Sequence, residues 1–284
     1  MSGSAWAILV ALSLIWSYNW IVMKQALAYA GPFTFSALRY AGGTAVLFCV
    51  LWARGARLTP PPFWPTLGIG LTQTAGFQAL VQWALEYGGA GKTALLAYTM
   101  PFWAIALAWP LLHTRPDRRQ WRAIGLAAAG LFLVVAPWQA IGSMASVLLA
   151  LAGGFSWGAG TVLAKRLFLR HPDASLLGVS AWQMLYGTVA LVLLACLIPQ
   201  PPVSWAPPLI GALAYNVLLA SGLGWSLWLL LVQRLPAHIA SLTSLATPLL
   251  GVFLAWLILQ ERPGRWEFAG MALIVAALLE LRRR

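Results

Sequence analysis

Charged residues are scarce in this sequence. Asp, Glu, Lys and Arg together make up 8% of its 284 residues, whereas a soluble globular domain carries about 25%. A soluble domain of this size could not cover its surface with so few charges. Hydrophobic residues make up 61% of the chain, and apolar segments of about 20 residues, the length needed to cross a bilayer, recur throughout it. The composition therefore excludes a soluble protein and indicates a polytopic α-helical membrane protein.

Groups that usually carry out catalysis or bind metals are scarcer still. The chain has three histidines and two cysteines, at no spacing typical of metal ligands. Its six acidic residues all fall at the ends of apolar segments or between them: Glu86, Asp117, Asp173, Glu261, Glu267 and Glu280. A charge at the bilayer centre costs at least about 2.5 kcal/mol and is retained mainly for a function such as ion coupling. We therefore expect no catalytic residues, no metal, no cofactor and no proton coupling.

The net charge of +12 comes from 18 Lys and Arg residues. In a soluble protein such a charge would suggest nucleic-acid binding. In a membrane protein, Lys and Arg instead collect in cytoplasmic loops and fix the orientation. We expect the lipid bilayer rather than nucleic acid as the partner, and a monomer is compatible with the sequence.

An internal duplication organises the chain. The segment Ala94–Pro116 (ALLAYTMPFWAIALAWPLLHTRP) resembles Ser241–Pro263 (SLTSLATPLLGVFLAWLILQERP) at a constant offset of 147 residues. At this offset Pro101 matches Pro248, and Trp, Arg and Pro residues that follow also match. Such repeats define the architecture and are sought first.

Gly- and Pro-rich breaks divide the chain into ten predicted spans. Their approximate ranges are 5–25, 32–53, 63–86, 92–113, 118–137, 143–166, 175–198, 206–232, 237–260 and 264–281. Because five spans fall in each half, the second half must enter the membrane from the opposite side. The sequence thus predicts an all-α fold of ten transmembrane helices, built from two inverted five-helix repeats, residues 1–140 and 141–284.

Loop charge predicts the orientation. With the N-terminus inside, the cytoplasmic side holds Arg54, Arg57, Arg115, Arg118, Arg119, Arg122, Lys165, Arg166, Arg170, Arg234, Arg282, Arg283 and Arg284. The outer side holds only Lys24, Lys92, Arg262 and Arg265. Cytoplasmic loops are enriched in Lys and Arg, so we expect both termini in the cytoplasm. Arg39 lies within a span, and we expect it to reach the outer interface or to pair with a carbonyl; the alternative is a role in substrate binding.

Polar and aromatic residues inside the spans are the candidates for substrate binding. Lipid cannot satisfy amide groups, so these side chains should face protein or a watery cavity. Gln78 and Gln82, one turn apart, share a helix face. The alternative for the small polar residues is hydrogen bonding between helices. The candidates are Asn19, Gln78, Gln82, Tyr98, Trp157, Thr161, Asn216, Trp225 and Ser244.

We expect a cavity at mid-membrane, lined by spans 1, 3, 4, 6, 8 and 9. An aromatic lining with a few amides suits a flat, apolar ligand with one polar head. Many of the 17 tryptophans should instead lie in interfacial belts. Pro101 and Pro248 should kink their helices; they are candidate gates, and the alternative is a role in helix shape alone.

Taken together, these features resemble the EamA-type carriers of the drug/metabolite transporter superfamily. The resemblance rests on the ten spans, the two repeats, Arg39-Tyr40, the two matched prolines, and Glu261-Arg262 followed by Trp266 and Gly270. The length and the Trp-rich spans are similar to bacterial exporters of aromatic amino acids. The two repeats differ at one position of this motif: Thr114 of the first repeat aligns with Glu261 of the second.

The resemblance implies a carrier in the bacterial inner (cytoplasmic) membrane that exports small metabolites, foremost amino acids with aromatic or apolar side chains. The alternative substrates are hydrophobic drugs or organic cations. A membrane-embedded enzyme acting on lipids would need facing His, Asp, Glu or Cys groups, which the spans do not offer. A channel would be expected to show charged or carbonyl rings along a pore. The inverted repeats with paired kinks favour a carrier instead.

Overall fold

The residues that the structure describes fold into helices. The structure is a computed structural model and describes residues 3–56, 58–87, 90–135, 143–236, 240, 244–259 and 264–282. The helices are α1 (Gly3–Ala26), α2 (Pro32–Ala53), α3 (Phe63–Ile69), η1 (Gly70–Gly76), α4 (Phe77–Tyr87), α5 (Ala90–Ala97), α6 (Met100–Leu112), α7 (Arg118–Val135), α8 (Met144–Arg170), α9 (Leu176–Leu197), α10 (Pro207–Tyr215), η2 (Asn216–Leu223), α11 (Gly224–Arg234), α13 (Ala246–Leu259) and α14 (Arg265–Arg282). Within these ranges, five helices are long and apolar enough to cross a membrane, and shorter apolar helices accompany them.

The third and eighth predicted spans each contain a π-helical segment. η1 lies between α3 and α4, and η2 lies between α10 and α11. The two segments begin at Gly70 and Asn216, close to the offset of the sequence repeat. π-Helical turns are rare and frequently lie near functional sites. Sequence periodicity alone did not indicate either of them.

The fourth predicted span is broken rather than kinked. α5 ends at Ala97, a turn follows at Tyr98–Thr99, and α6 begins with Pro101 in its first turn. Pro248 likewise lies in the first turn of α13, just after a turn at Ser244–Leu245. Proline is tolerated in a first turn, where its missing N–H is not needed, but clashes with the preceding turn inside a helix. The expectation of kinked helices is therefore corrected: these positions start new helices.

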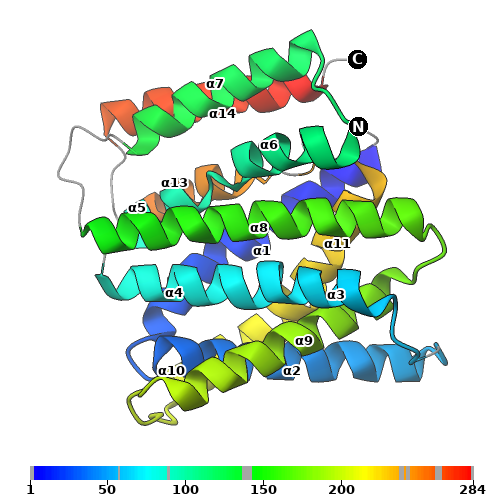
Figure 1. The fold of residues 1–284 in the computed structure, drawn as a ribbon. Helices are drawn as coiled ribbons and strands as arrows, with labels where there is room; N and C mark the ends of the chain where they lie inside the picture. Colours follow the sequence, from blue (N-terminus) through cyan, green and yellow to red (C-terminus); the bar gives the residue numbers. More distant parts are fainter. Residues whose placement is uncertain are drawn as a thin grey trace.

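The packing of the helices is preserved when the two halves of the chain are exchanged. α2 packs against α9, and α7 packs against α14. α6 packs on α8 as α13 packs on α1, and η1 packs on α9 as η2 packs on α2. Figure 1 shows α7 and α14 side by side as an outer layer, with α8 crossing the bundle between α6 and α4. This pattern supports our proposal of two five-helix units, whose boundary at residues 140 and 141 lies outside the described residues.

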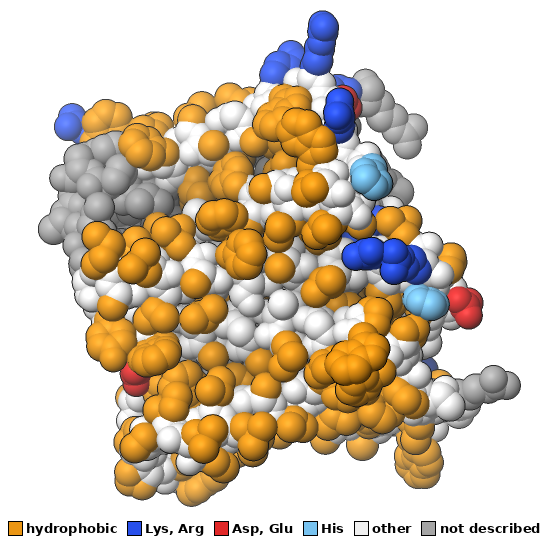
Figure 2. Space-filling model, in the orientation of Figure 1, with side chains coloured by type: hydrophobic (Ala, Val, Ile, Leu, Met, Phe, Trp, Pro, Cys, Tyr) orange, Lys and Arg blue, Asp and Glu red, His pale blue; other side chains and the backbone are white. Residues whose placement is uncertain are grey.

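The two ends of the bundle differ in charge. α1 begins and α14 ends at the same end of the bundle (Figure 1). On the face drawn in Figure 2, Lys and Arg gather at that end, while hydrophobic side chains cover the middle. There an Nη of Arg122 lies 2.7 Å from a carboxylate oxygen of Glu280 and ties α7 to α14. The apolar middle is suited to lipid, and the basic end is suited to the cytoplasmic surface.

Candidate substrate-binding cavity

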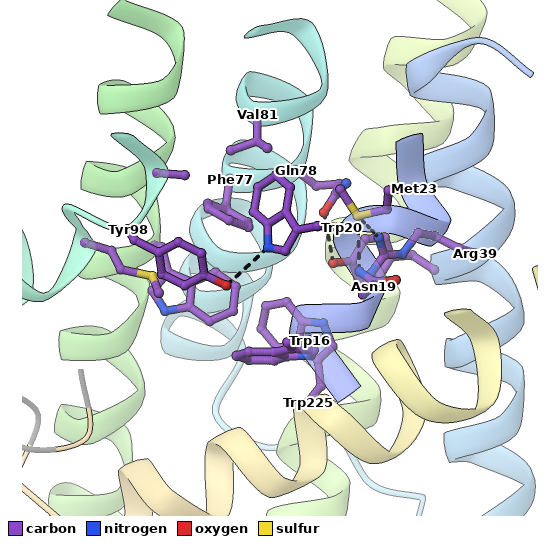
Figure 3. Close-up of a pocket in the computed structure, with 14 residues that line it drawn as sticks. Trp16, Asn19, Trp20, Met23, Arg39, Phe77, Gln78, Val81, Tyr98 and Trp225 are labelled. Atoms are coloured by element: carbon purple, nitrogen blue, oxygen red, sulfur yellow. Dashed lines mark hydrogen bonds between the residues drawn. The ribbon is translucent and has the colours of Figure 1, made fainter. Parts of the chain in front are cut away.

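A small cavity lies where the two halves of the chain meet. It is lined by residues of α1, α2, α4, α5, α6, α8 and α11, together with Tyr98 in the turn between α5 and α6. Its volume is about 50 Å³. Figure 3 shows side chains from several helices converging on this space. In this conformation the cavity is too small for an amino-acid side chain of aromatic size.

Aromatic rings form most of the wall. Trp157 of α8 is the centre of the cluster: its ring centroid lies 4.7 Å from that of Phe77, 5.0 Å from that of Trp225 and 5.3 Å from that of Trp16. Edge-to-face and offset pairs at these distances contribute about 0.5–1.5 kcal/mol each beyond their buried area. The indole Nε1 of Trp157 is buried with no hydrogen-bond partner among the described residues. The wall is therefore apolar, with an unused donor within it.

The Trp16 side chain links α1 to the π-helical segment of the other half. Its Nε1 donates to the carbonyl oxygen of Ala220 in η2 at 3.1 Å. A side chain at Gly224 would bring its Cβ within 2.7 Å of the same nitrogen, so only glycine leaves room for the indole there. Trp228, which lies outside the cavity lining, packs behind it, with its ring centroid 5.9 Å from that of Trp16 and 5.4 Å from that of Trp157. These rings close one side of the cavity.

Two hydrogen bonds orient polar groups in the wall. The Trp20 Nε1 donates to the Tyr98 hydroxyl at 3.1 Å, and the Tyr40 hydroxyl donates to the Gln78 Oε1 at 3.3 Å. The Gln78 Nε2 is buried and has no partner among the described residues. A buried amide donor without a partner is costly to the fold, so this nitrogen is well suited to a ligand in the cavity.

Arg39 of α2 is the charged residue in the wall. It is 2% exposed. Its Nε lies 3.4 Å from the Ser221 hydroxyl and one Nη lies 3.1 Å from the Met23 sulfur. The guanidinium also lies 4.7 Å from the Tyr40 ring centroid. The expectation that Arg39 reaches the outer interface was wrong, because neighbouring helices enclose the side chain.

The structure brings five of the nine sequence-predicted binding residues to the cavity. They are Asn19, Gln78, Tyr98, Trp157 and Trp225. The other four lie outside its lining: Gln82, Thr161, Asn216 and Ser244. Neither proline of the candidate gates lines it, although Met100, next to Pro101, does.

Thr161 and Asn216 make hydrogen bonds within the helix bundle. Thr161 Oγ1 lies 2.9 Å from the Gln73 side-chain amide and 3.0 Å from the Trp157 carbonyl oxygen. Asn216 donates from Nδ2 to the Ala212 carbonyl oxygen, one turn earlier in the same helix, at 2.9 Å. The contact of Thr161 with Gln73 joins α8 to η1 and is the alternative foreseen for polar residues in spans, whereas the Asn216 bond stays within one helix. Gln82 is fully buried one turn beyond Gln78, and Ser244 lies in the turn before α13.

Sequence reasoning missed the contribution of the second span to the cavity. Arg39 and Tyr40 both line it, as does Met23 of α1. A signal was available for Arg39: an arginine inside an apolar segment, with no acidic residue one turn away on either side. Such intramembrane charges usually face the bundle interior and mark a functional site.

Comparison with known protein families assigns the chain to one of them. The EamA-like transporter family matches residues 1–136 and 144–282. The chain belongs to this family. As an EamA-like transporter it is a membrane protein that moves a small-molecule substrate, and its family and named relatives are transporters rather than enzymes.

Relatives of this EamA-like transporter cover nearly its whole length. The "Uncharacterized transporter YoaV" of Bacillus subtilis (strain 168) is 26% identical over 89% of this chain and 88% of that protein. The "Probable amino-acid metabolite efflux pump" of Salmonella typhimurium is 27% identical, covering 93% and 90%. A crystal structure at 21% identity superposes with a TM-score of 0.82 over 99% of this chain and 97% of that chain. That likeness shows the shared fold.

Proposed function

We propose that this transporter exports amino acids with aromatic or apolar side chains by alternating access between its two halves, without proton coupling. The observation that carries the proposal is the cavity between the halves, walled by aromatic rings of Trp16, Phe77, Trp157 and Trp225. Such a wall binds flat apolar side chains, while a few polar groups orient the rest of the ligand. Two curated relatives carry the name of amino-acid metabolite efflux pumps, which favours the same substrate class.

In this proposal Asn19, Gln78, Tyr98, Trp157 and Trp225 contact the substrate. The cavity of about 50 Å³ then widens to admit the substrate. The break before Pro101 supplies movement, because it separates the short helices α5 and α6, which can tilt independently. Pro248 holds the matching place in the first turn of α13. These two prolines therefore remain our candidate gates.

Organic cations and hydrophobic drugs are the alternative substrates. A cation-binding cavity requires an anionic group or an aromatic box, and the rings here could form a box. Arg39, however, lines the same space, and arginine stays charged in proteins. Its positive charge repels a cationic ligand at close range. The composition of the wall therefore favours amino acids over cations.

The proposed setting is the bacterial cytoplasmic membrane, with ten spans in two inverted repeats and both termini in the cytoplasm. The basic residues at the end of the bundle where α1 begins and α14 ends support this orientation (Figures 1 and 2).

Counterflow in proteoliposomes tests the proposed function. The purified protein is reconstituted with unlabelled L-tryptophan, L-phenylalanine or L-leucine inside, and uptake of the labelled amino acid is measured against empty liposomes. We expect counterflow for these substrates and none for tetraphenylphosphonium. Counterflow of the cation alone would overturn the proposal and establish the alternative.

A further inference from the structure

Asn19 and Arg39 lie together at one side of the cavity (Figure 3). Figure 3 shows Asn19, Met23 and Arg39 together, across Trp20 from Tyr98. The Asn19 Nδ2 and an Nη of Arg39 each lie 3.1 Å from the sulfur of Met23. Two contacts of 3.1 Å with one atom place these nitrogens at most 6.2 Å apart. This spacing is comparable with the size of an amino-acid head group.

Arg39 has hydrogen-bonding capacity to spare. A guanidinium carries five N–H donors, and the described acceptors are one hydroxyl at 3.4 Å and one thioether sulfur at 3.1 Å. A thioether is a weak acceptor. The salt bridges found among the described residues both involve Glu280, with Arg119 and Arg122. The buried cation thus faces the cavity with uncharged partners, and a buried charge is normally paired.

Asn19 presents the complementary group. Its Nδ2 is engaged with Met23, and its Oδ1 is buried without a hydrogen-bond partner in the described part of the chain. Asn19 is 7% exposed and lines the cavity. An unsatisfied carbonyl oxygen accepts a hydrogen bond from an ammonium group. A cationic donor therefore stands beside a free neutral acceptor.

We propose that Arg39 and Asn19 bind the zwitterionic head of an α-amino acid, with the substrate carboxylate on Arg39 and its ammonium on Asn19 Oδ1. The inference rests on the proposed function, since it assumes that the same cavity takes the substrate. A carboxylate paired with a guanidinium neutralises both charges inside the membrane and uses the fork geometry of arginine. The side chain of the substrate then extends from this head toward the rings around Trp157. The selectivity for amino acids comes from these two residues, and the preference among side chains comes from the rings.

If Arg39 serves substrate binding, its buried charge should lower the stability of the protein when no ligand is bound. Replacing a buried ion pair by apolar groups of similar size is often neutral or stabilising, and the described partners of Arg39 are uncharged, so its removal leaves no charge unpaired. We therefore expect the Arg39→Met variant, without ligand, to melt at the same temperature as the wild type or higher. A residue with a purely structural role would instead lower the melting temperature when removed.

Ligand binding is measured by the shift in melting temperature of the full-length protein in detergent. The probes are L-phenylalanine, L-phenylalaninamide, 3-phenylpropionate and 3-phenylpropanamide, which remove the carboxylate charge, the ammonium or both. In the wild type, each carboxylate should bind about 10- to 100-fold more tightly than its amide, as expected for a charge-assisted hydrogen bond. In Arg39→Met that preference should disappear. In Asn19→Leu the preference for L-phenylalanine over 3-phenylpropionate should disappear, while the preference for carboxylates stays.

Arg122→Met is the matched control. Arg122 is mostly exposed, and neither it nor its partner Glu280 lines the cavity, so its removal should leave all four affinities unchanged. An unchanged carboxylate preference in Arg39→Met overturns the proposal, as does a wild type that prefers neither carboxylate. If Arg39→Met does not fold, Arg39→Gln carries the same comparison, and failure of both assigns Arg39 a structural role. Arg39-dependent binding of 3-phenylpropionate without binding of L-phenylalanine would keep the anion site but reject amino acids as substrates.

Discussion

Trp16 and Trp157 contact each other edge to face, with ring centroids 5.3 Å apart and an angle of 85° between the rings. The two residues hold matching places in the two halves, since Lys24 and Lys165 each follow eight residues later. Contact between equivalent residues is expected where a pseudo-twofold axis passes between α1 and α8. This part of the cavity wall thus lies where the two halves meet. A movement of one half against the other would open the cavity there.

The first prediction concerns this aromatic contact. Replacing Trp157 by Ala should weaken binding of L-tryptophan by at least about tenfold, because it removes the ring that contacts Phe77, Trp16 and Trp225. Uptake of L-alanine by the same variant should fall less, since the methyl side chain of this substrate cannot reach the aromatic rings of the cavity. Trp64→Ala, at a side chain that is 78% exposed, is the control. Equal losses for both amino acids would indicate general damage rather than a side-chain site.

The second prediction concerns the close packing of η1 on α9. A Cβ at Gly187 would overlap the Thr74 side chain and lie 2.8 Å from the Gly70 carbonyl oxygen. We expect Gly187→Ala to destabilise the protein by about 1–3 kcal/mol through overpacking, which a lower melting temperature in detergent would report. Gly125, with no atom within 4 Å of a built Cβ, is the matched site, and Gly125→Ala should be neutral or stabilising. A normal melting temperature for Gly187→Ala would show that the two helices are not held this closely.

The third prediction tests the gates. Pro101 stands in the first turn of α6, whereas Pro110 lies inside the same helix near its end. Pro101→Ala removes the restriction that separates α5 from α6 and favours one continuous helix. We expect it to slow counterflow while preserving equilibrium binding, because the gate moves less easily. Pro110→Ala should leave counterflow unchanged. Identical rates for the two variants and the wild type would remove Pro101 from the gating mechanism.

The fourth prediction concerns energy coupling. A proton-driven carrier usually keeps an ionisable acid in the substrate path, and the lining of this cavity contains none. We expect a pH gradient imposed on proteoliposomes to leave amino-acid accumulation at its equilibrium level. The experiment compares liposomes with and without the gradient, at equal internal buffer capacity. Accumulation driven by the gradient and lost in Glu86→Gln would refute uncoupled transport.

The fifth prediction concerns topology. Basic residues gather at the end of the bundle where α14 finishes (Figure 2), so we expect the C-terminus in the cytoplasm. A reporter that is active only in the cytoplasm should therefore be active when fused to the C-terminus. A companion fusion of a reporter that requires the periplasm should be inactive at the same position. The opposite pair of activities would reverse the proposed orientation.

The helical membrane class and the duplication followed from the sequence, because both depend on residue types and their order. Few charges and long apolar segments suit only lipid, and a repeat is visible wherever rare residues such as Pro101 and Pro248 recur at one offset. The aromatic and amide character of the cavity could also be predicted. Asn19, Gln78 and Trp157 lie inside predicted spans, where lipid offers no hydrogen-bond partner to their polar groups.

The tertiary structure decided which of these side chains meet. Gln78 and Gln82 lie one turn apart, yet only Gln78 lines the cavity. The wall continues along α4 at Val81, which is turned about 100° from Gln82 around the helix axis. Arg39 could have extended toward the outer interface, as its position near a span end suggested. Instead α1 and η2 enclose it beside Met23 and Ser221, a placement set by the rotation of α2 about its axis. That rotation depends on contacts with neighbouring helices, and the order of residues along one helix does not contain it.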